Sequence, residues 1–113
     1  MNSATTTPVF AQIITTPEVT PARYDAVNVS IGSAPIAGNL LSAAGFDDAA
    51  MTTLDVWDSR AAARRFVADR LIPAFERTGN IPEPYNSAVE FDGRMTVSAA
   101  PPARVHLRIS RIP

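Results

Sequence analysis

Asp55 and Trp57 are the first pair of residues in this sequence whose types and spacing could do chemistry. They lie two positions apart in LDVWDS, so a β-strand there would turn both side chains to one face. A carboxylate can serve as a base or a hydrogen-bond acceptor, and an indole ring can stack on a flat ligand. A buried Asp55 would need an arginine nearby or would have a functional role, because burial without a partner is costly or raises the pKa. In the alternative interpretation, Trp57 fills the corner between a sheet and a helix, and Asp55 is peripheral.

Tyr24 and Asn28 form a second candidate pair. They share one face of a predicted helix with Val27 and Ile31, at positions i, i+3, i+4 and i+7. Polar groups on an apolar stripe need hydrogen-bond partners. The pair could orient a phenol or carbonyl oxygen of a substrate. Alternatively, the tyrosine hydroxyl reaches solvent and the asparagine lies at the edge of the stripe.

Three further side chains are candidates for substrate binding. Gln12 lies in the middle of the strand-like segment VFAQII and either faces a pocket or forms a hydrogen bond across the sheet. Phe66 lies on the apolar stripe of a second predicted helix, and Arg70 interrupts that stripe. Arg70 could bind an anionic group or neutralise a buried carboxylate, or its charged end could reach solvent at the rim.

The composition excludes several kinds of chemistry. The 113 residues contain no cysteine and no lysine, ten arginines and one histidine. Thiol nucleophiles, disulfides and Schiff-base lysines are therefore excluded, and a metal site normally needs more imidazole or thiolate. We accordingly expect no metal and no cofactor. His106 is expected on the exposed side of a strand, and it could act as a base only if the C-terminal tail folds over a pocket.

Charge and hydropathy limit the partners. The formal net charge of −1 provides no concentrated positive field for nucleic acid or an anionic membrane. No apolar run approaches the roughly 18–20 residues of a membrane span. The segment MNSATTTPVF lacks the basic and apolar regions of a signal peptide. A cytoplasmic location is the resulting expectation.

Hydrophobic periodicity and turn residues predict the elements that must position these side chains. Thr20 and Pro21 begin one helix. Asp58 or Ser59 caps the other, and Gly79 ends it. Pro73 should kink or break the second helix near residues 71–72, and the pair Asp92-Gly93 predicts a turn. The strands are expected at residues 9–14, 39–45, 51–57 and 85–91, and the helices at 20–31 and 58–78.

The order β-α-β-β-α-β predicts a ferredoxin-like α+β fold, with a four-stranded antiparallel sheet and helices on one face. We expect a frayed N-terminus over residues 1–7, the domain over 8–92, and a strand-forming C-terminal extension over 93–113. The second face of the sheet carries apolar side chains and needs a cover, for which a second copy of the chain is the simplest candidate.

The segments VFAQII, TPARYDAVN, LDVWDS and RAAARRFVADRLIPAF resemble the dimeric α+β barrel domains over residues 8–91. Within these, the chain is most similar to small actinobacterial proteins related to the antibiotic biosynthesis monooxygenases. The resemblance implies a homodimer with a pocket between sheet and helices in each subunit. Relatives include cofactor-independent oxygenases of polycyclic phenols, haem-degrading enzymes and polyketide cyclases.

The chain departs from that pattern at three positions. Haem-degrading relatives carry a tryptophan and a histidine where Phe66 and Glu76 stand here, so haem breakdown is disfavoured. Many close relatives carry a histidine where this chain has Ser42. Two hypotheses follow from the resemblance and the candidate residues. One is a cofactor-independent monooxygenase or cyclase acting on an aromatic or polyketide-like substrate, and the other is a non-catalytic ligand-binding or assembly module on the same barrel.

Overall fold

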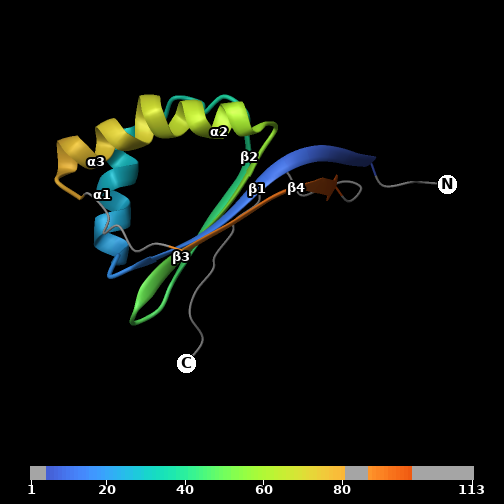
Figure 1. Cartoon of the computed structure of the whole chain (residues 1–113). Coiled ribbons are helices and arrows are strands. Elements are labelled where there is room, and N and C mark those ends of the chain that lie inside the picture. The colour runs from blue at the N-terminus through green and yellow to red at the C-terminus, as the bar shows by residue number, and fades with distance from the viewer. Residues whose placement is uncertain (1–4, 81–86, 98–113) are drawn as a thin grey trace.

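The computed structural model describes residues 5–80 and 87–97, which form one antiparallel sheet with helices on one face (Figure 1). The ferredoxin-like α+β fold predicted from the sequence is confirmed. None of the helices in these two ranges combines the length and apolar character needed to cross a membrane. The elements in chain order are β1 (Thr5–Pro17), α1 (Pro21–Ile31), β2 (Asn39–Phe46), β3 (Ala50–Trp57), α2 (Arg60–Phe66), the π-helical turn η1 (Val67–Leu71), α3 (Ile72–Thr78) and β4 (Ser87–Val97).

The sheet has the strand order β2-β3-β1-β4, and all neighbouring strands are antiparallel. The two longest strands, β1 and β4, pair from Thr5↔Val97 to Thr15↔Ser87. The shorter strands β2 and β3 are joined by a tight turn in which Oδ1 of Asp47 accepts two backbone N–H bonds. A β-bulge between residues 39 and 41 adjusts the register of β2.

The helices begin and end where the sequence predicts. The side chain of Thr20 accepts a hydrogen bond from the backbone N–H of Arg23, and Pro21 occupies the first turn of α1. Ser59 caps α2 through the N–H of Ala62. Gly79 ends α3 in the left-handed conformation, with φ 69°, which a glycine adopts at little cost.

Pro73 interrupts the α-helical winding without breaking the chain direction. The turn η1 widens to π-helical geometry just before the proline, and the backbone N–H of Ile72 donates to the carbonyl of Val67. Pro73 has no N–H and would crowd the carbonyl one α-helical turn earlier, so a wider turn relieves that clash. The winding returns to α-helical in α3.

The turn predicted at Asp92-Gly93 is wrong, because β4 runs straight through both residues. Asp92 pairs with Phe10 of β1 and its carboxylate forms a 3.3 Å ion pair with Arg60. The ring of Phe91 lies against Gly93 and covers its exposed backbone. β4 is therefore stabilised by strand pairing and side-chain contacts that cannot be predicted from the local sequence Asp92-Gly93.

The described strands also extend past the expected domain limits. β1 begins at Thr5, before residue 8, and β4 continues to Val97, past residue 92. The expected frayed segment therefore overlaps the start of β1. Tyr85, at the start of the strand expected over 85–91, and residues 98–113 of the expected extension, with His106, lie outside the described residues.

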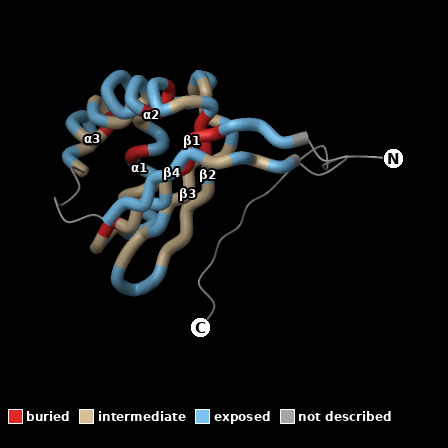
Figure 2. Tube along the Cα trace, turned by 45° about the vertical axis from the view of Figure 1, so that its right-hand side comes forward, coloured by how far each residue is buried: buried red, intermediate tan, exposed pale blue. Residues whose placement is uncertain are grey.

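The apolar core has one cluster on each face of the sheet. Buried positions on β1 and α2 are coloured red in Figure 2. On the helical face, Phe10 and Trp57 pack against Ala62 and Ala63 of α2. On the opposite face, Val9, Ala11 and Val56 pack together. Small alanines on α2 let the helix approach the sheet closely at the Trp57 end, so α2 fixes that end of the helical layer.

Candidate functional site

A row of four polar side chains crosses the helical face of the sheet. Ser42 pairs in register with Asp55, Asp55 with Gln12, and Gln12 with Glu90. Residues paired across strands point to the same face, so one side chain comes from each of the four strands. We call these four residues the polar row.

Asp55 and Ser42 form one half of the polar row. The Ser42 hydroxyl donates a 2.6 Å hydrogen bond to Oδ1 of Asp55. Burial raises the pKa of the Asp55 carboxyl above its ordinary range, and the hydrogen bond from Ser42 partly opposes that rise. A carboxylate with a raised pKa is a stronger base than an exposed one, which suits general base catalysis.

Gln12 and Glu90 form the other half, together with the indole of Trp57. The indole Nε1–H donates to Oε1 of Gln12 at 3.0 Å. Nε2 of Gln12 donates to the Glu90 carboxylate at 2.7 Å. The Gln12 amide thus forms hydrogen bonds across the sheet, on the face that the helices cover.

The Gln12 amide lies in the polar row. A ligand on the helical face could therefore contact the same amide that forms these hydrogen bonds.

Trp57 is a core residue in this structure. Its side chain is 2% exposed, and its ring lies 5.4 Å from the ring of Phe66 at an interplanar angle of 41°. Phe10 and the alanines of α2 complete its surroundings. This geometry fits the interpretation of a ring that fills the corner between sheet and helix. Trp57 therefore has no open ring face for stacking, and the partly buried Phe66 packs on it at this end of the sheet.

Solvent reaches the polar row although helices cover this face of the sheet. Gln12 and Asp55 are only half-buried, and so are Ile14 and Thr53 in the next row of β1 and β3. These four residues lie on the two central strands, where a helix packed directly on the sheet would bury them. The accessible region beside Asp55 is the candidate functional site.

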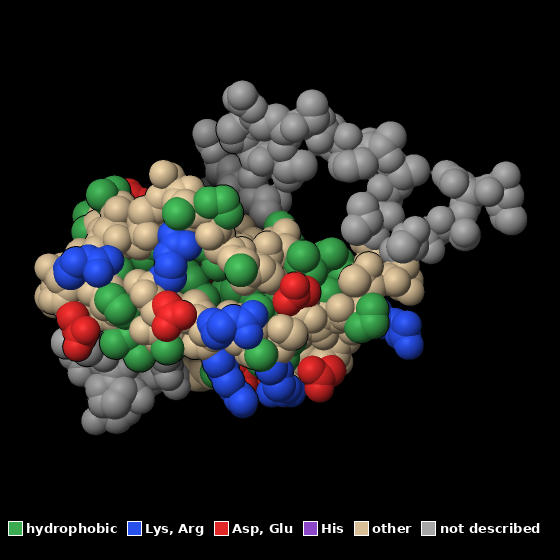
Figure 3. Space-filling view, turned by 90° about the horizontal axis from the view of Figure 1, so that it is seen from above, with side chains coloured by type: hydrophobic (Ala, Val, Ile, Leu, Met, Phe, Trp, Pro, Cys, Tyr) green, Lys and Arg blue, Asp and Glu red, His purple; other side chains and the backbone are tan. Residues whose placement is uncertain are grey.

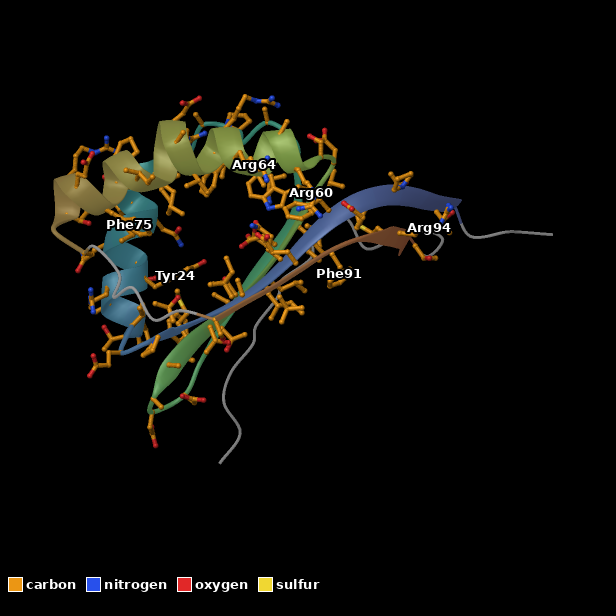
Figure 4. The ribbon with its side chains drawn as sticks, in the orientation of Figure 1. Tyr24, Arg60, Arg64, Phe75, Phe91 and Arg94 are labelled. Atoms are coloured by element: carbon orange, nitrogen blue, oxygen red, sulfur yellow. The ribbon has the colours of Figure 1, made fainter. Side chains whose placement is uncertain are left out.

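Tyr24 and Asn28 lie on α1 but differ in their surroundings. Tyr24 is half-buried, points from α1 toward the sheet, and packs edge-to-face on Phe46 of β2, with ring centroids 5.5 Å apart (Figure 4). Asn28 is exposed, and its backbone carbonyl accepts the N–H of Gly32 at the end of the helix. Tyr24 thus packs against the sheet at Phe46, whereas the Asn28 side chain lies at the surface.

Arg70 holds the end of α1 in place. Its guanidinium donates to three backbone carbonyls, at 2.9 Å to Ile31 and at 3.1 Å to both Ala34 and Pro35. Cations near the C-terminus of a helix stabilise its unpaired carbonyls. These bonds occupy much of the hydrogen-bonding capacity of the Arg70 guanidinium, which therefore ties η1 to the end of α1 instead of binding a substrate.

Sequence reasoning did not select Ser42 or Glu90 as site residues. Each lies on an edge strand, and only the register of the sheet brings it beside Asp55 or Gln12. The alternation of polar and apolar residues in β4 would have placed Glu90 on the same face as Asp92. The position of that face relative to Gln12 depends on pairing between residues 78 positions apart.

Searches for relatives by sequence found no matching family model and no matching curated protein. Comparison of structures did find relatives. SnoaB, a cofactor-independent oxygenase from Streptomyces nogalater, matches with a TM-score of 0.53 at 16% identity, over 86% of this chain and 98% of that chain. A putative antibiotic biosynthesis monooxygenase from Chloroflexus aurantiacus matches with a TM-score of 0.51 at 18% identity, over 72% and 90% of the two chains.

A protein of unknown function from Nitrosomonas europaea is similar to the same extent, with a TM-score of 0.53 at 13% identity over 86% of this chain and 97% of that chain. Identities this low establish a shared architecture and leave the reaction open. The matches cover nearly the full length of each of these three chains and most of this one, so the fold is shared along most of the sequence. The chain shares its ferredoxin-like α+β fold with SnoaB and with the putative antibiotic biosynthesis monooxygenase from Chloroflexus aurantiacus.

Proposed function

We propose that the protein is a cofactor-independent oxygenase that acts on a polycyclic phenol or a related polyketide-like compound. The observation that carries the proposal is Asp55, a half-buried carboxylate whose pKa is raised by burial, at the centre of the solvent-accessible polar row. The fold shared with SnoaB, described as a cofactor-independent oxygenase, supports the same reaction class.

In this proposal Asp55 is the general base. A substrate with an acidic C–H or O–H group beside Asp55 would lose a proton to the carboxylate and become an electron-rich anion. Gln12 supplies a hydrogen bond to the substrate oxygen, and Tyr24 lines the wall formed by α1. Trp57 and Phe66 close the far end of the site by packing on each other.

The reaction balances without an added reductant. A CH₂ group between two aromatic rings reacts with O₂ to give a C=O group and water. Two C–H bonds and the O–O bond break, and the carbon loses the four electrons that O₂ gains. One oxygen atom enters the product and the other leaves as water. The proton taken up by Asp55 returns to that water, so the carboxylate is regenerated.

We also propose that the active form is a homodimer joined through the second face of the sheet. That face carries apolar side chains that remain exposed, namely Ile13 at 37%, Val89 at 59% and Phe91 at 46%. Phe91 points away from the helices (Figure 4). Contiguous apolar surface of this kind marks an interface, and a two-fold contact lets one patch cover its own copy.

The outer surface of the helices argues against a nucleic-acid partner. Seen from the helical side, arginines and carboxylates are interspersed with apolar side chains (Figure 3). Phosphate backbones are bound by concentrated positive charge, which this mixture does not provide. The partner that we propose is a small molecule at the polar row.

The test uses 1,8-dihydroxyanthrone, a tricyclic phenol with a central CH₂ group. The compound is incubated with the protein under air, in the presence of a chelator and without added flavin, and the anthraquinone product and the O₂ consumed are measured. We expect turnover faster than spontaneous oxidation, dependent on O₂ and largely lost in Asp55→Asn. Turnover equal to the spontaneous rate in wild type would contradict the oxygenase proposal.

A ligand-binding module is the second candidate, and the packing of Trp57 favours it, because the indole is buried and is not open to stack on a substrate. Polycyclic phenols that raise the melting temperature without being converted would support this function. Conversion of a linear polyketone without O₂ consumption would instead indicate a cyclase.

A further inference from the structure

The side-chain amide of Gln12 lies between two groups of opposite hydrogen-bonding character. Trp57 offers an N–H, which can only donate, to Oε1 of Gln12. Glu90 offers a carboxylate, which accepts when ionised, to Nε2 of Gln12. The two partners come from β3 and β4, on either side of the strand that carries Gln12.

These partners allow only one orientation of the amide. Turning it over would place Nε2 against the indole N–H and Oε1 against the carboxylate. Both contacts would then be repulsive, since each would join two donors or two acceptors. The 2.7 Å bond to Glu90 is charge-assisted and is therefore the stronger of the two.

An amide nitrogen carries two hydrogens, and Glu90 takes one of them. The second is available to a substrate, because Gln12 is half-buried and solvent reaches it. Gln12 is also the cross-strand partner of Asp55, so the amide and the proposed base stand side by side in the polar row. An oxygen that becomes negative when Asp55 removes a proton would lie within reach of this donor.

We propose that Glu90 and Trp57 are positioning residues that lock the Gln12 amide as a donor to the substrate oxygen beside Asp55. This inference rests on the proposed function for the identity of the substrate class. It adds a role for the edge strand β4, and it gives the buried tryptophan a function through its N–H in addition to its packing.

A fixed donor is worth more than a mobile one, because its dipole need not reorganise when the charge on the oxygen develops. If Gln12 could turn over, Oε1 would face the oxygen in part of the population and repel its charge. Loss of the lock should therefore weaken stabilisation of a phenolate more than it weakens binding of the neutral phenol.

The probe for the test is 1,8-dihydroxyanthraquinone, which changes colour when its phenol ionises. Its central carbons are already carbonyls, so it reports on the site without being oxidised in the proposed reaction. The measurement is the apparent pKa of the bound probe, read from its visible spectrum at saturating protein. We expect Gln12→Leu to raise that pKa by about one unit, a tenfold change in the acid constant.

Glu90→Gln has two opposing effects, and a mutant cycle separates them. Removal of a negative charge lowers the pKa of the bound probe, whereas loss of the lock raises it. In the Gln12→Leu background there is no amide to orient, so Glu90→Gln then measures the charge effect alone. Glu90→Gln changes the pKa of the bound probe both in the protein with Gln12 and in the Gln12→Leu variant. We expect the change to be more positive, by about half a unit, in the protein that has Gln12. Equal changes in the two backgrounds would overturn the inference.

Trp57→Phe provides an independent arm with no change of charge. It retains an aromatic ring against Phe66 and removes the N–H that faces Gln12. We expect Trp57→Phe alone to raise the pKa of the bound probe slightly. The rise should be larger when Trp57→Phe is added to Glu90→Gln, because both bonds that hold the Gln12 amide are then changed. Equal rises in both backgrounds, or no spectral response of the probe to wild-type protein, would also overturn the inference.

Asp92→Asn is the matched control, because it removes a carboxylate from the same face of β4 without contacting Gln12. It should reproduce the charge effect alone, and a rise of the probe pKa in this variant would contradict the lock. The oxidation of 1,8-dihydroxyanthrone is measured separately for every variant. If the quinone ionises as expected but the anthrone is not oxidised, the positioning role of Glu90 and Trp57 is supported and the oxygenase proposal is contradicted.

Discussion

The hydroxyl of Ser42 lies 2.6 Å from Oδ1 of Asp55, although the two residues belong to different strands and stand 13 positions apart in the sequence. The bond stabilises the ionised form of a carboxyl whose pKa is raised by burial. It also holds one carboxylate oxygen and leaves the other for a substrate. Ser42 is therefore a positioning residue for the proposed base.

Replacing Ser42 by alanine should raise the pKa of Asp55 further, because the hydrogen bond that opposes the effect of burial is lost. A general base must be deprotonated, so the rate falls as pH drops through its pKa. The acidic limb of the rate profile should therefore move to higher pH in Ser42→Ala. Ser87→Ala, at the exposed start of β4, is the control. A limb that moves to lower pH would contradict the assignment.

Asp55→Asn should change how stability depends on pH. Because the folded pKa of Asp55 is raised, the folded state holds its proton more tightly than the unfolded state. Its contribution is fully present below the unfolded pKa of about 4 and is lost as pH rises through the folded value. The melting temperature of Asp55→Asn, measured relative to wild type, should therefore rise with pH across that window and then level off.

Asp92→Asn serves as the control for that experiment, since the Asp92 side chain is 75% exposed. Its melting temperature relative to wild type should show no comparable rise. A relative melting temperature of Asp55→Asn that falls with increasing pH would be inconsistent with a carboxyl whose pKa is raised by burial.

Trp57→Ala should cost about 3–5 kcal/mol of unfolding free energy, because it removes a side chain that is 2% exposed and leaves a cavity. Trp57→Phe should cost much less, since a ring remains against Phe66. Urea unfolding measures both values. Arg64→Ala, on the exposed side of α2, should stay within about 0.5 kcal/mol of wild type. Similar losses in Trp57→Ala and Arg64→Ala would show that Trp57 is not a core anchor.

Gly38→Ala should destabilise the protein more than Gly32→Ala. Both glycines have positive φ, 80° and 89°, so alanine at either position carries a backbone cost of roughly 1–2 kcal/mol. A Cβ at Gly38 would in addition overlap with Cβ of Ala62 and lie 2.7 Å from Oδ1 of Asp58, whereas one at Gly32 meets open space. Thermal unfolding of the two variants compares them directly, and equal losses would argue against close packing of the turn before β2 on α2.

Phe91→Glu should dissociate the proposed homodimer, because it places a charge in the middle of the apolar sheet face. Light scattering after gel filtration gives the mass of wild type and variant at the same concentration. Val29→Glu is the matched control, since Val29 is 81% exposed on α1 in the helical layer. A wild-type protein with the mass of one chain would refute the dimer.

The sequence by itself determined the order of elements, their caps and the faces of the strands. Thr20, Ser59 and Gly79 act through neighbours within four residues, so local chemistry is enough to place the helix ends. Alternation along β3 put Asp55 and Trp57 on one face, as the structure confirms. The turn expected at Asp92-Gly93 failed because its pairing with β1 is a long-range contact.

Only the tertiary structure decided which polar side chains meet. Gln12, Asp55 and Glu90 share a row because antiparallel registers align three distant segments, and a shift of one residue in any register would send one of them to the other face. Burial is likewise a property of the assembled layers, so the raised pKa of Asp55 and the enclosure of Trp57 depend on how α2 and the sheet pack. Residue types are local, whereas the distances between them are set by the fold.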